Sequence, residues 1–472
     1  MQRTLSLSDR EETLKFISGK DIRILNLCHV PDDGRLRTLS FSTASKNRVG
    51  EILDYGERVD GSSLFRSIPP GKSDIYLQPD VQRAFVNPFA VLPTLNIMCN
   101  YMDGNGKTLD IAPSNVLRKA EESLHSSKGM ILKALAELEF YIMTPLRTQP
   151  LFRAEPDSNY HASSPFTQYE EVRNEILAVL DMIGIQTKYG HGEVGCIVDK
   201  NGMFMEQHEI ELIPKTLSQT AEAIPLVKWT IRNVCSRHGV SASFVPKMDL
   251  AHAGTGMHIH LCATRRGKNV MSDPDGGISK ETLAMIGGIL KLAPSLSAFG
   301  NPTPVSYLRF IARKESPMNI CWSASNRLAL IRIPLWWNFM KASKAENCRE
   351  TFEYRAPDAF ANAHMLLAGL AIAVDYGTSN QKEAIKISED LHIDDRKDNS
   401  QKLRNLPRSC SESAANLRRQ RRFYEANSIF PRKLVDSILS KLEAFGDKNL
   451  WKTLSSKPEM VETLVTQYIH YG

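Results

Sequence analysis

Glu137-Leu138-Glu139-Phe140 places two carboxylates inside the otherwise apolar run Ile131-Leu-Lys-Ala-Leu-Ala-Glu-Leu-Glu-Phe-Tyr-Ile-Met143. In a strand, residues two positions apart share a face, so Glu137 and Glu139 point one way and Leu138 points the other. A carboxylate held among apolar side chains needs a cation or an arginine beside it. The run therefore predicts a buried strand with one face that attracts positive charge.

A second stretch, Gly254-Thr-Gly-Met-His258-Ile-His260, repeats this spacing with two imidazoles. His258 and His260 share one face of a strand, and Met257 and Ile259 point to the other. Either pair alone is also typical of the solvated face of a half-exposed strand. The apolar flanks of the first stretch favour the other interpretation, a site for a divalent metal ion.

Composition excludes several classes of protein. The chain has 472 residues, 42% of them hydrophobic and 24% charged, which excludes disordered and fibrous proteins and allows two or more domains. The net charge of +6 comes partly from one basic stretch, residues 417–423, so a nucleic-acid partner is not expected. Eight cysteines without a CxxC pair indicate a reducing compartment. We find no apolar signal core and no run long enough to span a membrane, and we expect a cytoplasmic protein.

The order of predicted elements indicates two domains. Ile22 to Val30 and Leu36 to Ser42 alternate in polarity around the turn Pro31–Gly34, which predicts a hairpin in a small β-rich domain over residues 15–111. The remainder, residues 112–472, alternates strands with longer helical segments, which indicates an α+β fold with an antiparallel sheet. The predicted helices span residues 169–183, 216–238, 279–293 and 359–376, followed by a helical C-terminal part at 432–445 and 450–468.

Further motifs follow in a characteristic order. They are Asp60-Gly-Ser-Ser, Gly192-Glu193-Val194, Glu206-Gln-His-Glu209, Asn301-Pro-Thr, Arg309, Glu315-Ser-Pro, Ser325-Asn-Arg327, Ile331-Arg332-Ile-Pro and Phe352-Glu353-Tyr-Arg355. Together with the two opening stretches, this set resembles type I glutamine synthetase from about Ile22 to Tyr376. The resemblance implies an N-terminal β-grasp domain, a catalytic α/β domain, and a dodecamer of two stacked hexameric rings with active sites between subunits.

The resemblance also implies two metal sites. Glu139, Glu193 and Glu209 match the ligands of one metal, and Glu137, His258 and Glu353 match those of the other. Carboxylate and imidazole ligands without thiolates suit Mg²⁺ or Mn²⁺ rather than zinc.

The remaining matched residues would bind the substrates, which the resemblance gives as ATP, L-glutamate and ammonium. Arg327 and Arg332 would contact phosphate, Arg355 would contact the transferring group or product, and Arg309 would clamp the α-carboxylate of glutamate. Gly254 belongs to the matched glutamate site and His260 to the nucleotide site. Asp60 matches an aspartate that reaches in from a neighbouring subunit, and Glu315 matches a flap glutamate that excludes water.

Several positions depart from the family pattern and leave the acceptor open. Ala253 and Val305 stand where relatives usually carry asparagine near the substrate, and Ser325 and Thr351 stand where basic residues are common. The leading hypothesis is ATP-dependent ligation of ammonia to glutamate through a γ-glutamyl phosphate. One alternative is a γ-glutamyl amide ligase that uses a polyamine or another amine. A second is a non-catalytic structural relative, although that reading predicts loss of metal ligands and none is lost.

The chain also differs from the family pattern by two longer loops and at the position that enterobacterial relatives adenylylate. Insertions of about eight residues lie between Cys196 and Met205 and between Trp336 and Cys348. Arg404 occupies the position, before Leu406-Pro407, where enterobacterial relatives carry the tyrosine that is adenylylated. We therefore expect no adenylylation at that site.

Overall fold

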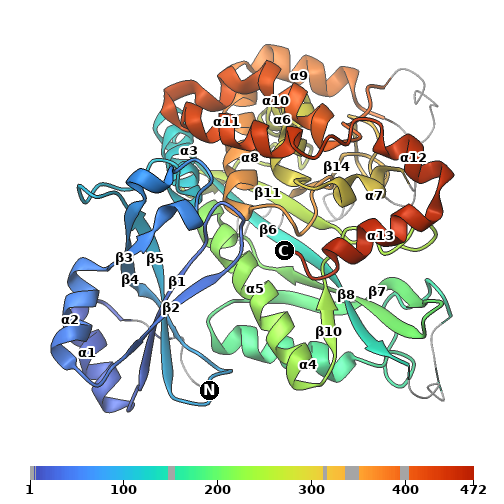
Figure 1. Ribbon diagram of the computed structural model, residues 1–472. Helices are drawn as coiled ribbons and strands as arrows, with labels where there is room; N and C mark the ends of the chain where they lie inside the picture. The colour runs from blue at the N-terminus through green and yellow to red at the C-terminus, as the bar shows by residue number, and fades with distance from the viewer. Residues whose placement is uncertain are drawn as a thin grey trace.

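A computed structural model describes residues 5, 7–146, 152, 155–311, 316–334, 350–393 and 403–472. Its strands form two sheets. The small sheet is built from strands near the N-terminus, and the large sheet is built from strands of the later part of the chain. Figure 1 shows the small sheet in blue beside the large sheet, with the C-terminal helices in orange and red across the top and right of the view.

The small sheet has five strands in the order β2-β1-β5-β4-β3. The predicted hairpin is confirmed, because β1 pairs antiparallel with β2 and places Ile24 opposite Ser42. β1 also pairs parallel with β5, which makes the sheet mixed. The strand bounds are β1 Ile24–His29, β2 Arg37–Ser42, β3 Glu57–Asp60, β4 Asp74–Val86 and β5 Thr94–Met102; helices α1 (Arg10–Gly19) and α2 (Lys46–Tyr55) accompany them.

The large sheet is built around the long strand β6, which contains the opening sequence stretch. Its main order is β13-β14-β15-β11-β6-β8-β7, and every neighbouring pair is antiparallel except β13 and β14. The antiparallel arrangement predicted for this domain is therefore confirmed. The bounds are β6 Met130–Pro145, β7 Thr187–Val198, β8 Met203–Leu212, β11 Met257–Arg265, β13 Trp322–Ser323, β14 Ile331–Arg332 and β15 Phe352–Tyr354, with short strands β9 Lys215–Thr216, β10 Ser241–Ser243 and β12 Lys268–Asn269.

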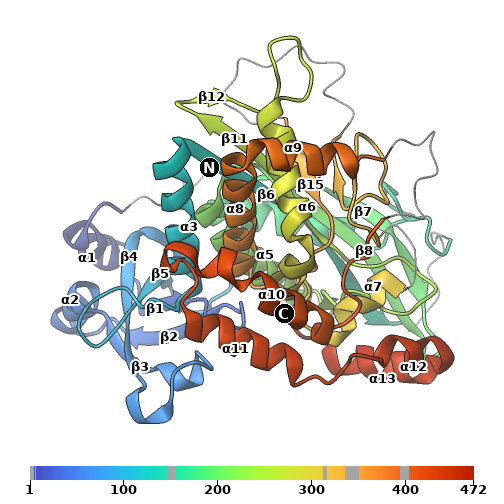
Figure 2. The same ribbon diagram turned by 90° about the horizontal axis from the view of Figure 1, so that it is seen from above.

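Helices cover this sheet in layers that Figure 2 shows from above. α8 contacts α3, α5 and α6, and α3 and α5 also contact β6. The bounds are α3 Pro113–Lys128, α4 Glu170–Met182, α5 Leu217–Arg237, α6 Lys280–Gly300, α7 Leu308–Ile311, α8 Ala363–Ser379, α9 Gln381–Asp390, α10 Cys410–Glu425, α11 Arg432–Glu443, α12 Leu450–Ser456 and α13 Pro458–Tyr468.

Two predicted helices differ from the observed ones at prolines. α6 runs seven residues beyond the predicted end, through Pro294, because its apolar side chains are buried on almost every side. The predicted helix 450–468 is instead two helices that meet at Lys457, whose backbone is not helical, in line with the preference of a residue before proline.

α6 is long and apolar enough to cross a membrane by length and composition, but 89% of its most apolar window is buried inside the molecule. The helix packs closely on α8 at Gly288 and Gly377, where a Cβ atom on either glycine would collide with the backbone of the other helix. Its apolar character is therefore explained by its place in the core.

Candidate active site and metal centre

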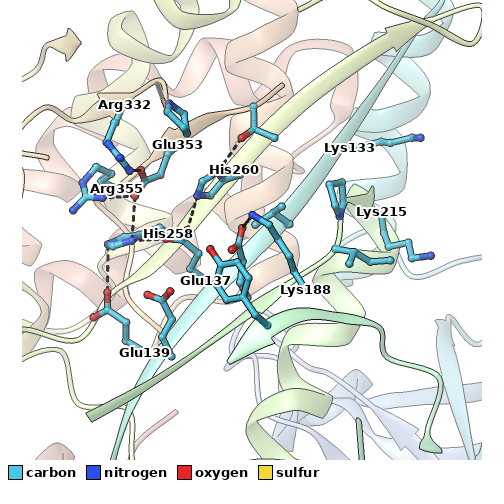
Figure 3. Close-up of a pocket in the computed structure, with 18 of the residues that line it drawn as sticks. Lys133, Glu137, Glu139, Lys188, Lys215, His258, His260, Arg332, Glu353 and Arg355 are labelled. Carbon is cyan, nitrogen blue, oxygen red and sulfur yellow. Dashed lines mark hydrogen bonds and ion pairs between the residues drawn. The ribbon is translucent and has the colours of Figure 1, made fainter. Parts of the chain in front are cut away.

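The register of the large sheet gathers the predicted ligands on one face. His258 lies opposite Glu137, and Glu139 lies opposite Glu209 on the other side of β6. On β15, Glu353 pairs with His260 of β11. Since directly opposed residues project from the same face, these side chains converge over β6 (Figure 3). They line a cavity of about 1250 Å³.

Glu137, His258 and Glu353 form one group of potential metal ligands. The Nδ1 atom of His258 lies 3.0 Å from Glu137 and 3.2 Å from Glu353. Burial opposes ionisation of Glu137, but His260 and His258 outweigh it and hold the pKa of this carboxyl well below its ordinary value. The group brings together the three residues that the resemblance assigns to one metal.

His191, Glu193 and Glu209 form a second group. The Nε2 atom of His191 lies 3.2 Å from Glu209, and its Nδ1 atom lies 3.7 Å from Glu193. Burial, together with the neighbouring carboxylates of which Glu137 and Glu139 act most strongly, raises the pKa of Glu209 well above its ordinary value. His191 was not predicted from the sequence, although it precedes Glu193 at the same two-residue spacing as the other ligand pairs.

Glu139, the third residue predicted for this second metal, lies at the edge of the group. One of its oxygens accepts hydrogen bonds from Gln207 Nε2 at 3.2 Å and from the backbone N–H of Gly256 at 2.8 Å. Its other oxygen lies 3.8 Å from His258 Nε2. The role of Glu139 as a ligand stays a prediction.

A third group combines Glu137, His260 and Glu211. His260 Nε2 lies 2.9 Å from Glu137, and Lys188 forms an ion pair of 2.8 Å with Glu211. The sequence analysis also missed Glu211, which follows Glu209 by two residues and therefore projects from the same face of β8. With it, the cavity wall carries six carboxylates.

Basic side chains occupy both ends of the same cavity. Arg332 Nη1 lies 3.2 Å from Glu353, which also pairs with Arg355. Burial raises the pKa of Glu353, but Arg355 outweighs this effect and the net pKa is below the ordinary value. Arg327 lines the cavity as well. Figure 3 shows the lysines at the opposite end, and these are Lys133, Lys188 and Lys215.

A smaller cavity of about 260 Å³ adjoins the metal groups and contains Gly254 and Arg309 on its wall. The guanidinium of Arg309 is buried and donates hydrogen bonds of 2.9 Å to the carbonyls of Ala356 and Pro357. Among the residues that the structure describes, its Nε atom has no hydrogen-bond partner. Ala253 lines this cavity, and its carbonyl accepts a hydrogen bond from the hydroxyl of Tyr141 at 3.3 Å.

The structure leaves the roles of two predicted catalytic residues untested. Asp60 is exposed and lines neither cavity; its carboxylate accepts hydrogen bonds from Ser63 and Ser62, which lower its pKa. Glu315 lies outside the described residues. The roles predicted for both residues stay predictions.

Two of the four residues that differ from the family pattern, Thr351 and Ser325, contact residues of the site. Thr351 Oγ1 lies 3.0 Å from His260 Nδ1, and the carbonyl of Ser325 accepts a hydrogen bond from Arg332 Nε at 3.2 Å. Val305 is fully buried. The first predicted insertion has its turn at residues 199–202, but its flanks pair as strands of the β7–β8 hairpin rather than forming a loop. The second insertion lies outside the described residues.

These residues fit a divalent cation. Glu209 is surrounded by other carboxylates. Among the described residues, no arginine or lysine lies within ion-pair distance of its carboxylate. Such a concentration of buried negative charge is stable only when cations or protons balance it. Carboxylate oxygens with one imidazole in each group are suitable ligands for Mg²⁺ or Mn²⁺.

Comparison with known families agrees with the fold. Residues 21–104 match the glutamine synthetase β-grasp domain, and residues 110–444 match the glutamine synthetase catalytic domain. The predicted fold class is therefore confirmed. The predicted boundary at residue 112 lies just inside the second match and stays a prediction.

Whole-chain relatives give the same result. The glutamine synthetase of Thermotoga maritima is 30% identical and covers 94% of this chain and 96% of its own, and that of Escherichia coli K12 is 25% identical over 91% and 94%. Two solved structures share the fold at 20% identity. Plasmodium falciparum glutamine synthetase has a TM-score of 0.81 and covers 95% of this chain and 98% of its own, and a protein described as apo GmaS has a TM-score of 0.75 and covers 94% and 96%. This chain belongs to the glutamine synthetase family of ligases.

Proposed function

We propose that the chain catalyses the ATP-dependent ligation of ammonia to L-glutamate through a γ-glutamyl phosphate. The observation that carries this proposal is the group of Glu137, His258 and Glu353. It lines the large cavity together with three arginines, and His258 lines the smaller cavity as well. Phosphoryl transfer needs balanced charge on the phosphates and two substrates held side by side. The site offers both.

The metal-binding residues would form two sets, each holding one Mg²⁺ or Mn²⁺ ion: Glu139, Glu193 and Glu209 in one, and Glu137, His258 and Glu353 in the other. When bound, these ions would neutralise the charge of the β- and γ-phosphates of ATP. Arg327, Arg332 and the lysines at the other end of the large cavity complement the remaining phosphate charge. ATP accordingly belongs in the large cavity.

Glutamate belongs in the smaller cavity, where Arg309 is a buried cation that can bind its α-carboxylate. In this pose the γ-carboxylate points toward Arg355, which lines both cavities. An oxygen of the γ-carboxylate then bonds to the γ-phosphorus of ATP while the bond to the β-phosphate oxygen breaks and ADP leaves. Arg355 stabilises the negative charge of the transferring group.

The second step joins ammonia to the activated carboxyl. Ammonium gives up a proton to a carboxylate, for which Asp60 of a neighbouring subunit is the proposed residue. The nitrogen then bonds to the γ-carbon while the carbon–oxygen bond to phosphate breaks, and the attached nitrogen gives up a second proton to the leaving phosphate, so glutamine and inorganic phosphate leave. Glu315 is the proposed closing residue that keeps water away from the acyl phosphate. This assignment requires a ring assembly, for which we propose the family's dodecamer in the cytoplasm.

The test is phosphate release from ATP with glutamate and Mg²⁺, measured with and without ammonium and followed by identification of glutamine. Ammonium-dependent release is the expected result. A variant that combines Glu137→Ala with Glu353→Ala should assemble normally and release none, which would exclude the non-catalytic alternative. Absence of release with every acceptor would contradict the proposal.

A γ-glutamyl amide ligase is the second candidate, favoured by Ala253 on the wall of the glutamate cavity and by buried Val305. Neither side chain offers the amide group that relatives usually place near the substrate. The same assay with putrescine and ethanolamine distinguishes the two functions. Faster release with an amine than with ammonium would establish the second candidate.

A further inference from the structure

Asp358 is a fully buried carboxylate in the turn at residues 355–361, and it has no role in the steps described above. From the contacts of this turn we propose that Asp358 is a positioning residue, which fixes the guanidinium of Arg309 in the orientation that binds the α-carboxylate of glutamate. The inference rests on the proposed function, which places glutamate in the smaller cavity. It adds the residue on which recognition of the α-carboxylate depends.

The backbone of the turn holds the guanidinium. Arg309 Nη1 donates to the carbonyl oxygens of Ala356 and Pro357 at 2.9 Å each, and Nη2 donates to that of Arg355 at 3.4 Å. The N–H donors of a guanidinium lie in one plane, so these contacts decide which edge remains for a carboxylate. The shape of the turn therefore determines how Arg309 meets its ligand.

Asp358 fixes the shape of the turn through both of its carboxylate oxygens. Oδ1 accepts a hydrogen bond from the backbone N–H of Phe360 at 3.0 Å, and Oδ2 accepts one from Asn301 Nδ2, also at 3.0 Å. The same Nδ2 donates to the carbonyl of Ala356 at 2.9 Å. Asn301 thus joins Asp358 to one of the carbonyls that hold Arg309. Because Asn301 and Asp358 are both fully buried, water cannot replace these hydrogen bonds.

Asp358 also stabilises the charge of Arg309. Burial lowers the pKa of the guanidinium, and Asp358 opposes this effect more strongly than Glu139 does. Burial likewise raises the pKa of Asp358, and Arg309 opposes that effect most strongly. A buried cation is costly unless an anion and hydrogen bonds compensate for the water that it has lost. Asp358 therefore supports both the orientation and the charge of Arg309 before glutamate binds.

Other contacts hold the backbone of the turn and should allow a variant of Asp358 to fold. The N–H of Asp358 donates to the Gly300 carbonyl at 3.1 Å, and the N–H of Met257 donates to the Pro357 carbonyl at 3.0 Å. Asp358→Asn keeps the shape of the side chain but turns an NH₂ group toward one of the two N–H donors. It removes one hydrogen bond and the negative charge, so the turn should loosen locally and Arg309 should lose its alignment.

The test compares two ligands that differ in the group that Arg309 recognises. L-Glutamate and γ-aminobutyrate share the γ-carboxylate and the amine, but γ-aminobutyrate lacks the α-carboxylate. Their affinities for the full chain are measured by calorimetry with Mg²⁺ and a non-hydrolysable ATP analogue. Asp447→Asn is the matched control, since Asp447 is also a buried carboxylate and accepts hydrogen bonds from the N–H groups of Cys410 and Ser411, at 2.8 and 3.0 Å.

We expect Asp358→Asn to bind glutamate about tenfold more weakly and γ-aminobutyrate with the wild-type affinity. The preference for glutamate then shrinks by the same factor. Asp447→Asn should unfold at a lower temperature and keep the wild-type preference. Equal weakening of both ligands in Asp358→Asn would overturn the inference, because Asp358 would then only stabilise the fold. Tighter binding of glutamate would also overturn it, because loss of a repelling charge would then outweigh loss of orientation.

Asn301→Ser is the second variant, and it serves if Asp358→Asn does not fold. It removes the amide that joins Asp358 to the Ala356 carbonyl, so the preference for glutamate should shrink in the same direction. A wild-type preference in both variants would overturn the role of Asp358 and leave the proposed function intact. A wild type that does not prefer glutamate would instead contradict the placement of glutamate beside Arg309, and the inference would fail with it.

Discussion

Gly256 provides a direct test of how tightly the site is built. A Cβ atom at this position would lie 2.6 Å from His258 Nε2 and 3.0 Å from Arg309 Nη2. An ordinary contact begins near 3.4 Å, so Gly256→Ala would displace the imidazole by about 0.8 Å. Displacements near 1 Å at a catalytic centre cost on the order of a hundredfold in rate. That loss corresponds to about 2.7 kcal/mol in the barrier.

Kinetics and metal binding should change together in Gly256→Ala. We expect phosphate release to fall by about a hundredfold, with weaker Mn²⁺ binding, because His258 is a proposed metal ligand and its ring must move. Gly254→Ala is a graded comparison, since its Cβ would meet Arg309 Cγ and the Pro246 carbonyl at 3.3 Å, a tight but tolerable distance. Gly71→Ala is the neutral control because no atom of the described residues, apart from its chain neighbours, lies within 4 Å of a Cβ at this position. A wild-type rate and wild-type Mn²⁺ affinity in Gly256→Ala would show that the His258 ring is not displaced from a catalytic position, contrary to this prediction.

Three further perturbations test the core, the assembly and the metal. Burial lowers the pKa of His364 from 6.5 to about 4. As pH falls, the unfolded chain therefore takes up this proton before the folded chain does, and the folded state loses stability between these two values. The urea midpoint should drop less from pH 7 to 5 in His364→Gln than in the wild type or in the exposed control His125→Gln. Co-assembly of Asp60→Ala with Glu353→Ala subunits should restore about a quarter of the wild-type activity, because a random mixture contains sites with both residues intact; no recovery would place both residues in one subunit's site. Removal of divalent cations should lower the unfolding temperature, and Mn²⁺ at about a hundred times its Kd should return roughly 3 kcal/mol; an unfolding temperature that ignores chelation would argue against a bound metal.

The parts of the site on regular strands could be predicted from the sequence. Glu137 and Glu139 share a face by the two-residue period of a strand, and His258 and His260 do so by the same rule. Antiparallel pairing of β6 with β11 then places Glu137 opposite His258, as observed. Local periodicity was sufficient because both strands run without interruption through the site.

His191 and Glu211 were not predicted, for two different reasons. The pairing of β7 with β8 shifts register between Gly192 and Cys196, directly after His191, which weakens the strand pattern around it. Glu211 continues the series from Glu209 on a regular strand, so its spacing alone could have identified it. The partners of Arg309 could not be predicted, because they are backbone carbonyls of Ala356 and Pro357, distant in sequence.

The proposed metal ligands lie on strands of the large sheet, whereas the residues that differ near the proposed glutamate cavity lie outside it. Substitutions near the acceptor therefore need not alter the metal ligands. Glu137, His258 and Glu353 are fixed by ladder hydrogen bonds, so a substitution that moves one of them disturbs its neighbours on the adjoining strands. Ala253 precedes β11 and Val305 follows α6, outside the sheet. Substitutions at such positions can alter the acceptor while the register of β6 and β11 stays intact. A family built this way can retain phosphoryl transfer while its members differ in the amine that they use.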